Sequence, residues 1–116
     1  MINVHSSDDR FALHLTCAYA AVREAFPHLS VRQIINPPHD QFDAALARQI
    51  ALHVMVSQFG WPKRRVVEQA NRSREALNRG LRTVDERMEA PRFAVVYRRI
   101  VWRAKALSVT KLRDAA

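Results

Sequence analysis

Seven polar side chains that could hydrogen-bond to nucleic-acid bases or phosphates lie close together between residues 72 and 82. They are Arg72, Ser73, Arg74, Glu75, Asn78, Arg79 and Arg82. An arginine such as Arg79 can bind O6 and N7 of a guanine together, or a phosphate, and Asn78 can pair with an adenine. The chemistry that this stretch favours is therefore recognition of DNA, in which no covalent bond is made or broken.

The helix that carries these side chains is expected to begin near Ser73. Ser73 is its predicted N-cap, which leaves the Ser73 backbone close to a phosphate. Arg72 and Arg74 flank the N-terminal end, the end that reaches base edges when such a helix lies in a groove. Glu75 has two interpretations, which the sequence leaves open. It suits the positive end of the helix dipole, or it accepts a hydrogen bond from a cytosine amino group.

Two helical patterns joined by a short corner would position this stretch. The second pattern buries one stripe, because its apolar side chains recur four, three and four residues apart: Leu77, Leu81, Val84 and Met88. It predicts a recognition helix from about Ser73 to Glu89, with Arg79 and Arg82 on the other side. The corner, residues 70–73, has the length of a helix-turn-helix turn, and Asn71 within it can adopt a left-handed conformation.

A shorter helix opened by Pro62 precedes the corner, and its inward positions are Val66, Val67 and Ala70. Its first turn carries three consecutive cations, Lys63, Arg64 and Arg65. The start of this helix is a usual place for contacts to the DNA backbone. The three cations are therefore predicted to bind phosphates, which position a protein on DNA without reading its sequence.

The charge of the chain is unevenly spread. Its 116 residues have a formal net charge of +8. Residues 1–40 hold three Lys or Arg against four Asp or Glu, a balance of −1, whereas residues 41–116 hold sixteen against seven, a balance of +9. Such a balance favours a polyanionic partner. Arg98, Arg99 and Arg103, near the C-terminus, are expected to form a solvated face rather than a second contact with DNA.

The first third of the chain is also helical in pattern, and the two glycines of the whole sequence are too few for a multi-stranded sheet. A first helix is expected from about Asp9 to Phe26, capped by Ser7 or Asp8. Ser30 is expected to cap a short second helix. The loop at residues 36–40 is stiff because it contains two consecutive prolines.

Two longer helices flank the helix-turn-helix. The first is expected from about Phe42 to Phe59 and ends at Gly60; its inward positions are Phe42, Leu46, Ile50 and Val54. The other begins at Pro91, and its inward positions are Phe93, Val96, Ile100, Ala104 and Leu107. The tail after Ser108 is expected to be frayed. Trp61 and Trp102 are expected to be apolar anchors where elements meet. The predicted fold class is all-α, a small helical bundle with a helix-turn-helix.

The sequence offers no pattern typical of catalysis or cofactor binding. Cys17, the single cysteine, excludes an internal disulfide and is expected to be a small core residue in a reducing compartment. The five histidines show no ligand-like pairing, so no metal is expected. No glycine-rich phosphate loop, signal peptide or apolar run near the ~20 residues that span a bilayer is present. The chain is therefore interpreted as a cytoplasmic, nucleoid-associated non-enzyme without a cofactor.

Residues 30–107 resemble the C-terminal DNA-binding domain of the bacterial replication initiator DnaA, a helical domain with a Trp-repressor-like helix-turn-helix. The resemblance is closest at Ala47-Arg-Gln-Ile-Ala-Leu52, which is similar to the family's Ala-Arg-Gln-Ile-Ala-Met. Arg72-Ser-Arg-Glu-Ala-Leu77 stands at the place of the family signature Arg-Asp-His-Thr-Thr-Val, and Arg82-Thr-Val84 is similar to Arg-Lys-Ile. Residues 30–35 stand where the family has a short helix before a basic loop.

The resemblance implies that the domain binds double-stranded DNA and that Arg48 and Gln49 contact the DNA backbone. From the residues alone, Arg48 could instead be a surface arginine whose aliphatic stem lies on the core. The chain departs from the family where Ser73-Arg-Glu-Ala76 replaces Asp-His-Thr-Thr, so a different target sequence is expected. Residues 37–41 replace the family's basic loop, and no ATPase domain accompanies the matched stretch.

The sequence therefore predicts a sequence-specific double-stranded DNA-binding protein, acting as a transcriptional regulator with helix 73–89 in the major groove. Two alternatives stay open. One is replication control by occupying initiator-like boxes, and the other is an interaction module that binds an acidic partner. Residues 1–28 are expected to form an N-terminal helix that caps the core or serves as a docking surface for RNA polymerase or another regulator. Residues 29–108 are the helix-turn-helix domain, residues 109–116 a flexible tail, and the protein a monomer or weak dimer.

Overall fold

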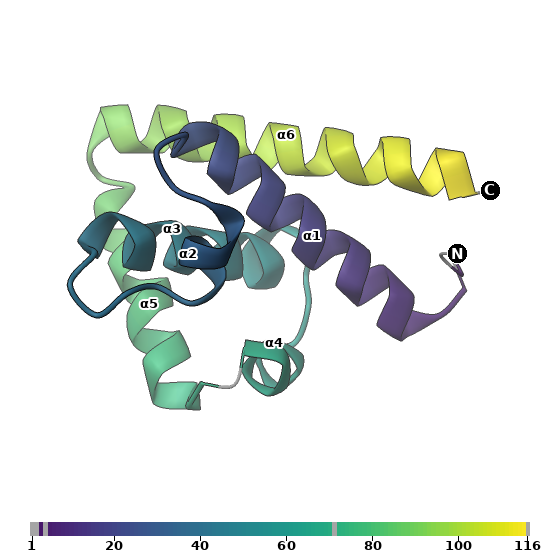
Figure 1. Ribbon diagram of the computed structural model, residues 1–116, viewed down its shortest axis with the longest axis horizontal. Helices are drawn as coiled ribbons and strands as arrows, with labels where there is room; N and C mark the ends of the chain where they lie inside the picture. The colour runs from purple at the N-terminus through teal and green to yellow at the C-terminus, as the bar shows by residue number, and fades with distance from the viewer. Residues whose placement is uncertain (1–2, 4, 71, 116) are drawn as a thin grey trace.

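The structure is a computed structural model that describes residue 3, residues 5–70 and residues 72–115, with side chains as far as Asp114. All regular backbone within these ranges is helical, so the predicted all-α class is confirmed (Figure 1). No helix in this part of the chain has both the length and the apolar character required to cross a membrane. The elements in chain order are α1 (Ser7–Ala25), α2 (Val31–Ile35), α3 (Phe42–His53), the π-helical turn η1 (Val54–Gln58), α4 (Lys63–Ala70), α5 (Arg74–Arg87) and α6 (Pro91–Ala115).

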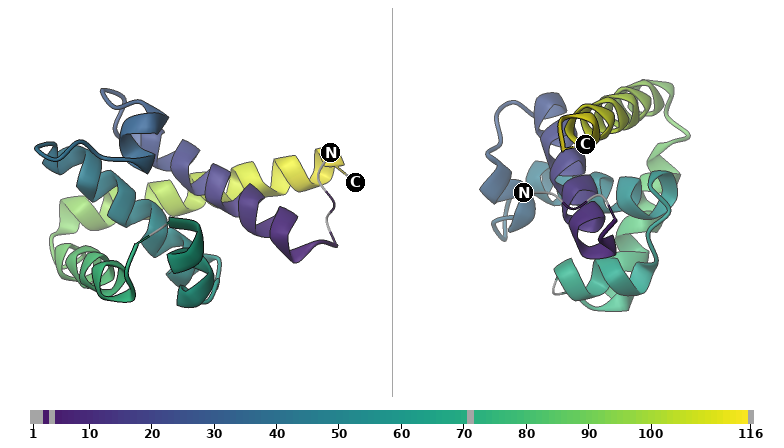
Figure 2. Two further views of the ribbon diagram at one scale, coloured as in Figure 1. Left: turned by 60° about the horizontal axis from the view of Figure 1, so that its bottom comes forward. Right: turned by 90° about the vertical axis from the view of Figure 1, so that its right-hand side faces the viewer.

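The central helix is α3, which packs against α1 on one side and α5 on the other. α1 and α6 lie against each other and run in opposite directions (Figures 1 and 2). α4 and the first turns of α5 lie on the side of the molecule away from α6 (Figure 1). One core joins all of these elements, because each helix contributes to its largest fully buried side chains: Cys17, Val22, Ile34, Ile50, Val54, Met55, Val66, Val84 and Ile100.

α1 belongs to the core rather than covering it from outside. Its N-cap is Ser6, whose side chain accepts a hydrogen bond from the backbone N–H of Asp9 at 3.3 Å. The prediction that Ser7 or Asp8 caps this helix is therefore wrong, because both lie inside its first turn. Cys17 is fully buried between α1 and its neighbours. Because Cys17 is buried, the pKa of its thiol is raised.

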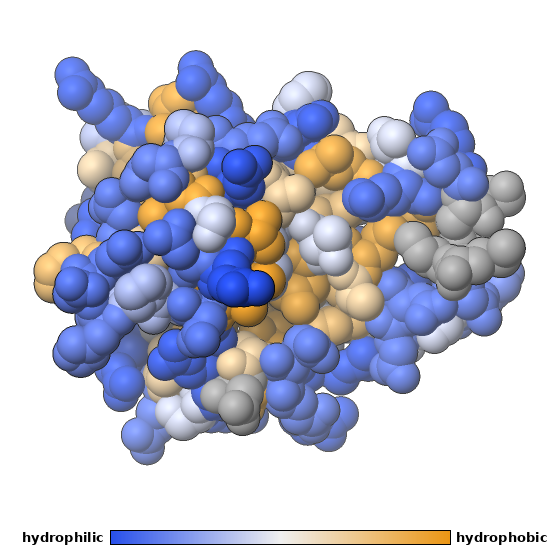
Figure 3. All heavy atoms as spheres, in the orientation of Figure 1, coloured by the Kyte–Doolittle hydropathy of each residue, from blue (hydrophilic) through white to orange (hydrophobic). Residues whose placement is uncertain are grey.

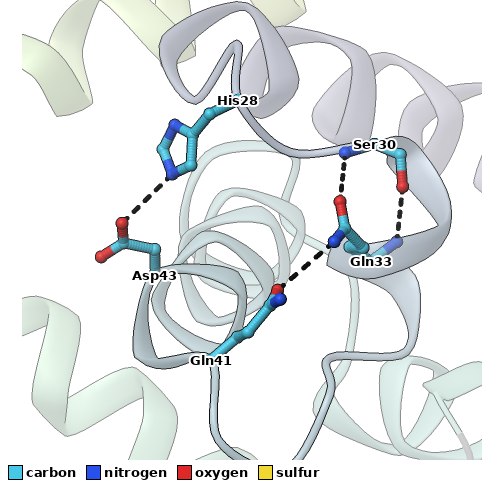
Figure 4. Close-up of polar contacts among 5 residues, drawn as sticks. All are labelled: His28, Ser30, Gln33, Gln41 and Asp43. Atoms are coloured by element: carbon cyan, nitrogen blue, oxygen red, sulfur yellow. Dashed lines mark hydrogen bonds and ion pairs between the residues drawn. The ribbon is translucent and has the colours of Figure 1, made fainter.

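The connection between α1 and α3 is held by side chains at both of its ends (Figure 4). Ser30 caps α2 as predicted and forms a reciprocal pair with Gln33, in which each side chain bonds the other's backbone N–H. Gln33 Nε2 also donates to Gln41 Oε1 at 3.4 Å, across the loop that contains the two prolines. His28 Nε2 lies 3.1 Å from Oδ2 of Asp43 at the start of α3. These contacts fix where α3 begins.

The long helix predicted from Phe42 to Phe59 is divided into two parts. α3 ends at His53 and continues as η1, where the backbone widens into a π-helical turn. Gly60 then follows with a φ of +73°, the left-handed conformation that glycine adopts without strain. The inward position predicted for Phe42 is wrong, since its side chain is 87% exposed. Phe42 faces away from the core, whereas Ala44 in the same turn of α3 is fully buried.

α6 is longer than predicted, and its buried face agrees only in part with the predicted one: Ile100 and Ala104 are buried as predicted. The helix continues to Ala115, so the frayed tail expected after Ser108 is wrong. Val96, predicted to be inward, is exposed, whereas Ala94 and Tyr97 are buried. The apolar residues of α6 occur on more than one face, and their spacing alone therefore could not decide which face is buried. Trp102, expected to be an anchor, has 71% of its surface exposed.

One buried histidine joins three helices. His53, at the end of α3, places Nδ1 2.5 Å from the hydroxyl oxygen of Tyr97 on α6 and Nε2 2.7 Å from Oδ1 of Asp85 on α5. Burial raises the pKa of Tyr97 to about 12. This polar network holds α5 and α6 to α3 beside the apolar core.

The segment between η1 and α4 is anchored to α1. Trp61 Nε1 donates a hydrogen bond to His14 Nδ1 at 2.8 Å. The His14 ring also stacks on Phe59, with ring centroids 4.1 Å apart. Burial lowers the pKa of His14, and the charge of Arg10 lowers it further. Trp61 is thus an anchor at a junction, as expected.

Candidate nucleic-acid interface

α4 and α5 pack together and are joined by a short corner, the arrangement of a helix-turn-helix. Ser73 is the N-cap of α5, as predicted, because its side chain accepts a hydrogen bond from the backbone N–H of Ala76 at 3.0 Å. The left-handed conformation suggested for Asn71 lies outside the described residues. Val66 of α4 is fully buried, so α4 is held against the core directly before the corner.

α5 has a buried face and an exposed cationic face, as the sequence predicts. Leu77, Leu81 and Val84 are buried. On the opposite face Arg79 and Arg82 are exposed. The side chains at the start of the helix are exposed as well: Arg72, Ser73, Arg74 and Glu75. Three arginines of α5 and Arg72 directly before its N-cap therefore point to solvent.

Asn78 differs from this group. It is only partly exposed, and its Oδ1 atom is buried without a hydrogen-bond partner among the described residues. The expectation that this side chain pairs with an adenine needs the amide to be open to solvent. In this conformation the oxygen is enclosed, so Asn78 lies beside the exposed face rather than on it.

Gln49 lies between α3 and α5. A Cβ atom built on Gly80 would lie 3.1 Å from Cγ of Gln49, which is tighter than an ordinary contact. Gly80 therefore permits the close approach of the two helices at this point. The stem of Gln49 is packed against α5, and this partly buried position supports α5 in addition to any contact that its amide makes.

Arg48 is not the exposed side chain that the sequence suggests. Only 8% of its surface is exposed. Its guanidinium donates to the backbone oxygen of Ile35 and, at 2.9 Å, to that of Ala70. These two residues end α2 and α4, where carbonyl groups lack helical partners and the helix dipole is negative. The predicted phosphate contact is corrected to a structural role: Arg48 holds the end of α4 at Ala70, where the corner begins.

Burial also affects the electrostatics of Arg48. It lowers the pKa of the guanidinium, and the nearby charge of Arg72 acts in the same direction. An arginine keeps its proton at neutral pH even when its pKa falls. The buried charge is therefore retained and is balanced by carbonyl dipoles, since the salt bridges of the described residues do not include Arg48.

The three cations at the start of α4 are not equivalent. Arg64 is exposed and Lys63 is partly exposed. Arg65 instead binds α1: Nη2 lies 2.9 Å from Oδ1 of Asp8, and Nη1 donates to Ser7 Oγ at 3.1 Å. Its guanidinium also lies 5.0 Å from the centre of the Phe11 ring, a cation–π distance. The phosphate contact predicted for Arg65 is therefore corrected to an anchor between α4 and α1.

A groove of about 510 Å³ lies between the proline loop, α3, α4 and the first half of α5. Arg72 and Arg79 line it from the α5 side and His39 from the loop. No sequence motif predicts this groove. The sequence feature that could have indicated the groove is a set of small residues on facing helices, which leave the space open: Ala45, Ala70, Ala76 and Gly80.

A smaller hollow of about 220 Å³ opens on the other side of Arg48, between α1, α2 and α4. Its lining is mostly apolar and includes Phe11, Leu15 and Ile35. Figure 3 shows apolar side chains gathered in the middle of the face seen in Figure 1, inside a rim of hydrophilic ones. Arg48 thus separates a cationic groove from an apolar hollow.

The described side chains contain no group of three His, Cys, Asp or Glu residues that could hold a metal ion. The exposed arginines brought together here are hydrogen-bond donors, suited to binding an anionic partner, and Glu75 is the acidic residue among them. Comparison of the chain with family models, with curated proteins and with solved structures gave no match.

Proposed function

We propose that this protein binds double-stranded DNA sequence-specifically, with α5 in the major groove, and acts as a transcriptional regulator. The observation that carries the proposal is the exposed face of α5. Arg79 and Arg82 lie opposite the buried stripe, and Arg72 and Arg74 are exposed at the N-terminal end. That end is the one that reaches base edges in helix-turn-helix proteins.

The dimensions of α5 suit this task. A helix with its side chains is about 10–12 Å wide, and the major groove of B-DNA is about 12 Å wide. α5 has 14 residues, so its length is about 21 Å. Its N-terminal half carries Arg74 and Arg79 against Glu75, a balance of +1, whereas in its C-terminal half Arg82 and Arg87 are balanced by Asp85 and Glu86. The helix would therefore enter the groove with its N-terminal end leading.

The exposed side chains take different roles in this proposal. Arg74, at the first position of α5, reads a base, and Arg72 beside it reads a base or binds a phosphate. Ser73 keeps its capping role. Arg79 and Arg82, further along the helix, bind phosphates or guanine. Arg64 and Lys63 at the start of α4 contact the backbone of the same strand.

Three side chains that the sequence places at the DNA support the interface from behind. Arg48 holds the end of α4, Arg65 anchors the start of α4 to α1, and Gln49 packs against α5 at Gly80. A helix-turn-helix reads bases with side chains only a few ångströms from the groove floor, so small displacements of α5 change the contacts. These residues are therefore positioning residues.

The resemblance to the initiator domain supports the same proposal. Its closest part, Ala47–Leu52, forms the middle of α3, in which Ala47 and Ala51 are fully buried and leave room for neighbouring helices. The residues at the start of α5 differ from the family's, however. The donors and acceptors at Arg74 and Glu75 differ from those of the family's histidine and threonine, and the target sequence is therefore a different one.

Selection of bound sequences from a random duplex pool tests the proposal. We expect one enriched site, and a palindromic site would mean that two copies bind together. On that site the logarithm of affinity should fall against the logarithm of salt concentration with a slope of roughly −4 to −5, because about five exposed cations neutralise phosphates. A slope shallower than about −1, or no enriched sequence, would contradict the proposal. Enrichment of the initiator's own box would instead indicate replication control.

A further inference from the structure

The outer face of α6 carries an apolar stripe that no other part of the described chain covers. Val95, Trp102 and Val109 are spaced seven residues apart, which places them on one side of a helix. Their exposed fractions are 41%, 71% and 53%. Scattered exposed apolar residues are common on protein surfaces, but these three lie in a row along one helix, about 10.5 Å apart, with a tryptophan at the centre.

Cations border this stripe on both sides. By helical spacing, Arg98 and Lys105 lie along one edge and Arg92 and Arg99 along the other. All four are exposed, and none takes part in a salt bridge of the described residues. The single acidic residue of α6 is Asp114, close to its C-terminal end.

The stripe is separate from the interface proposed for DNA. α6 lies along one side of the molecule, and α4 with the start of α5 lies along the opposite side (Figures 1 and 2). Arg103, which is also on α6, does not belong to the stripe, because its Nε donates to the carboxylate of Glu24 on α1 at 3.0 Å. A partner bound to the stripe would leave α5 free.

We propose that this stripe binds an acidic amphipathic α-helix of another protein. The apolar residues at intervals of seven match the apolar face of a partner helix lying along α6. Acidic side chains on both flanks of that helix would meet the arginines and the lysine of α6. Tryptophan and arginine are the residue types that contribute most to binding at protein interfaces, and Trp102 is in the centre of the stripe.

Charge separates this occupant from a second copy of the chain. Two α6 helices packed through their stripes would bring Arg98 and Arg99 of one copy against the cations of the other, and like charges in contact are destabilising. An acidic helix reverses the sign of each of these contacts. A surface that binds only phosphates needs cationic and polar side chains. The exposed tryptophan and valines at the centre of the stripe therefore favour a partner with an apolar face.

The test uses a synthetic peptide of about 21 residues, three heptads, with leucines on one face and glutamates on both flanks. A scrambled peptide of identical composition carries the same charge without the apolar face. Fluorescence anisotropy with the full chain should show that the ordered peptide binds at least about tenfold more tightly than the scrambled one. Trp102→Ala should weaken binding of the ordered peptide by at least about tenfold.

Phe42→Ala is the matched control, because Phe42 is an exposed aromatic residue on a different helix. It should leave peptide affinity unchanged. Equal binding of the two peptides, or equal affinity of the wild type and Trp102→Ala, would overturn the proposal. Sedimentation that shows a Trp102-dependent dimer would assign the stripe to a second copy. Trp102-dependent binding to vesicles of anionic lipid, without binding of the ordered peptide, would assign it to a membrane surface.

Discussion

α5 and α6 are both basic helices that bury one face, yet their exposed faces differ in kind. α5 carries four Arg and three acidic residues, whereas α6 carries seven Lys or Arg and a single Asp. Net charge alone would therefore assign DNA to α6. The centre of each exposed face indicates the opposite, because arginines occupy the centre on α5 and Trp102 with two valines occupies it on α6. The arrangement of charge around a face identifies the class of partner better than its total.

Reversal of two charges on each helix tests most directly whether α5 or α6 binds DNA. Arg79→Glu with Arg82→Glu should lower affinity for the selected duplex by roughly 10³-fold, about 4 kcal/mol, because phosphate contacts become repulsive. Arg98→Glu with Arg99→Glu changes the net charge by the same amount and should lower it by less than about fivefold. Duplex affinities of both variants at one salt concentration decide between the helices. A larger loss from the α6 pair would reverse the assignment.

Removing the side chain that holds α4 tests how far the presentation of α5 depends on its anchors. Arg48→Ala leaves the terminal carbonyls of α2 and α4 without a donor, and we expect the free energy of unfolding to fall by about 3 kcal/mol. Arg64→Ala, an exposed arginine on the neighbouring helix, should change it by less than about 0.5 kcal/mol. Urea unfolding followed by circular dichroism measures both. If Arg48→Ala keeps full stability and loses duplex affinity, Arg48 binds a phosphate after all.

Within the proposed interface, Arg74 and Arg64 are expected to differ, because Arg74 reads a base and Arg64 binds a phosphate. Arg74→Ala should weaken binding to the best site by about 2 kcal/mol and relax the preference at one or two base pairs. Arg64→Ala should instead weaken binding to all sequences alike. Competition between the selected and scrambled duplexes measures the difference. An unaltered preference in Arg74→Ala would show that Arg74 contacts the backbone.

The smallest expected effect concerns pH. The pKa of His14 is lowered in the folded protein, so at pH values below its ordinary value the unfolded chain binds a proton more readily. The stability contribution of neutral His14 is therefore complete above about pH 6.5 and is lost as the pH falls. In His14→Gln the amide oxygen still accepts from Trp61 but does not titrate. Between pH 7.5 and 5.5 this variant should lose less stability than the wild type, by under about 1 kcal/mol. Equal losses would contradict the prediction.

The elements of the fold could be predicted because their signals are local. The spacing of Leu77, Leu81 and Val84 gives the buried face of α5, and Ser30 and Ser73 give the start of two helices. On α6 the local spacing does not decide which face is buried, because apolar residues occur on more than one face. The inward position predicted for Val96 is therefore wrong. The local spacing also gives the wrong prediction for Phe42. The apolar spacing of α3 continues to its first residue, although that residue faces away from the core.

The roles of individual arginines could not be predicted, because their partners are distant in sequence. Arg48 binds a carbonyl 22 residues away, and Arg65 binds a carboxylate 57 residues away. From the sequence alone, the same role is predicted for Arg48, Arg64 and Arg65, a contact with the DNA backbone. Only the contacts of Arg48 with the ends of α2 and α4, and those of Arg65 with α1, distinguish the two anchors from the exposed residue. The cationic face of α5 was predictable because it is the complement of a local apolar stripe.

The two hydrogen bonds of His53 have donors and acceptors that follow from which atoms can carry a hydrogen. A carboxylate has no hydrogen to give, so Nε2 of His53 must carry one toward Asp85. In a neutral ring Nδ1 is then a pure acceptor, and the hydrogen between it and Tyr97 must come from the phenol, whose high pKa keeps it protonated. Only one tautomer of the imidazole satisfies both neighbours. With the ring in this neutral form, each hydrogen of the network points from α6 through α3 to α5, and contacts with both neighbouring helices together select the tautomer.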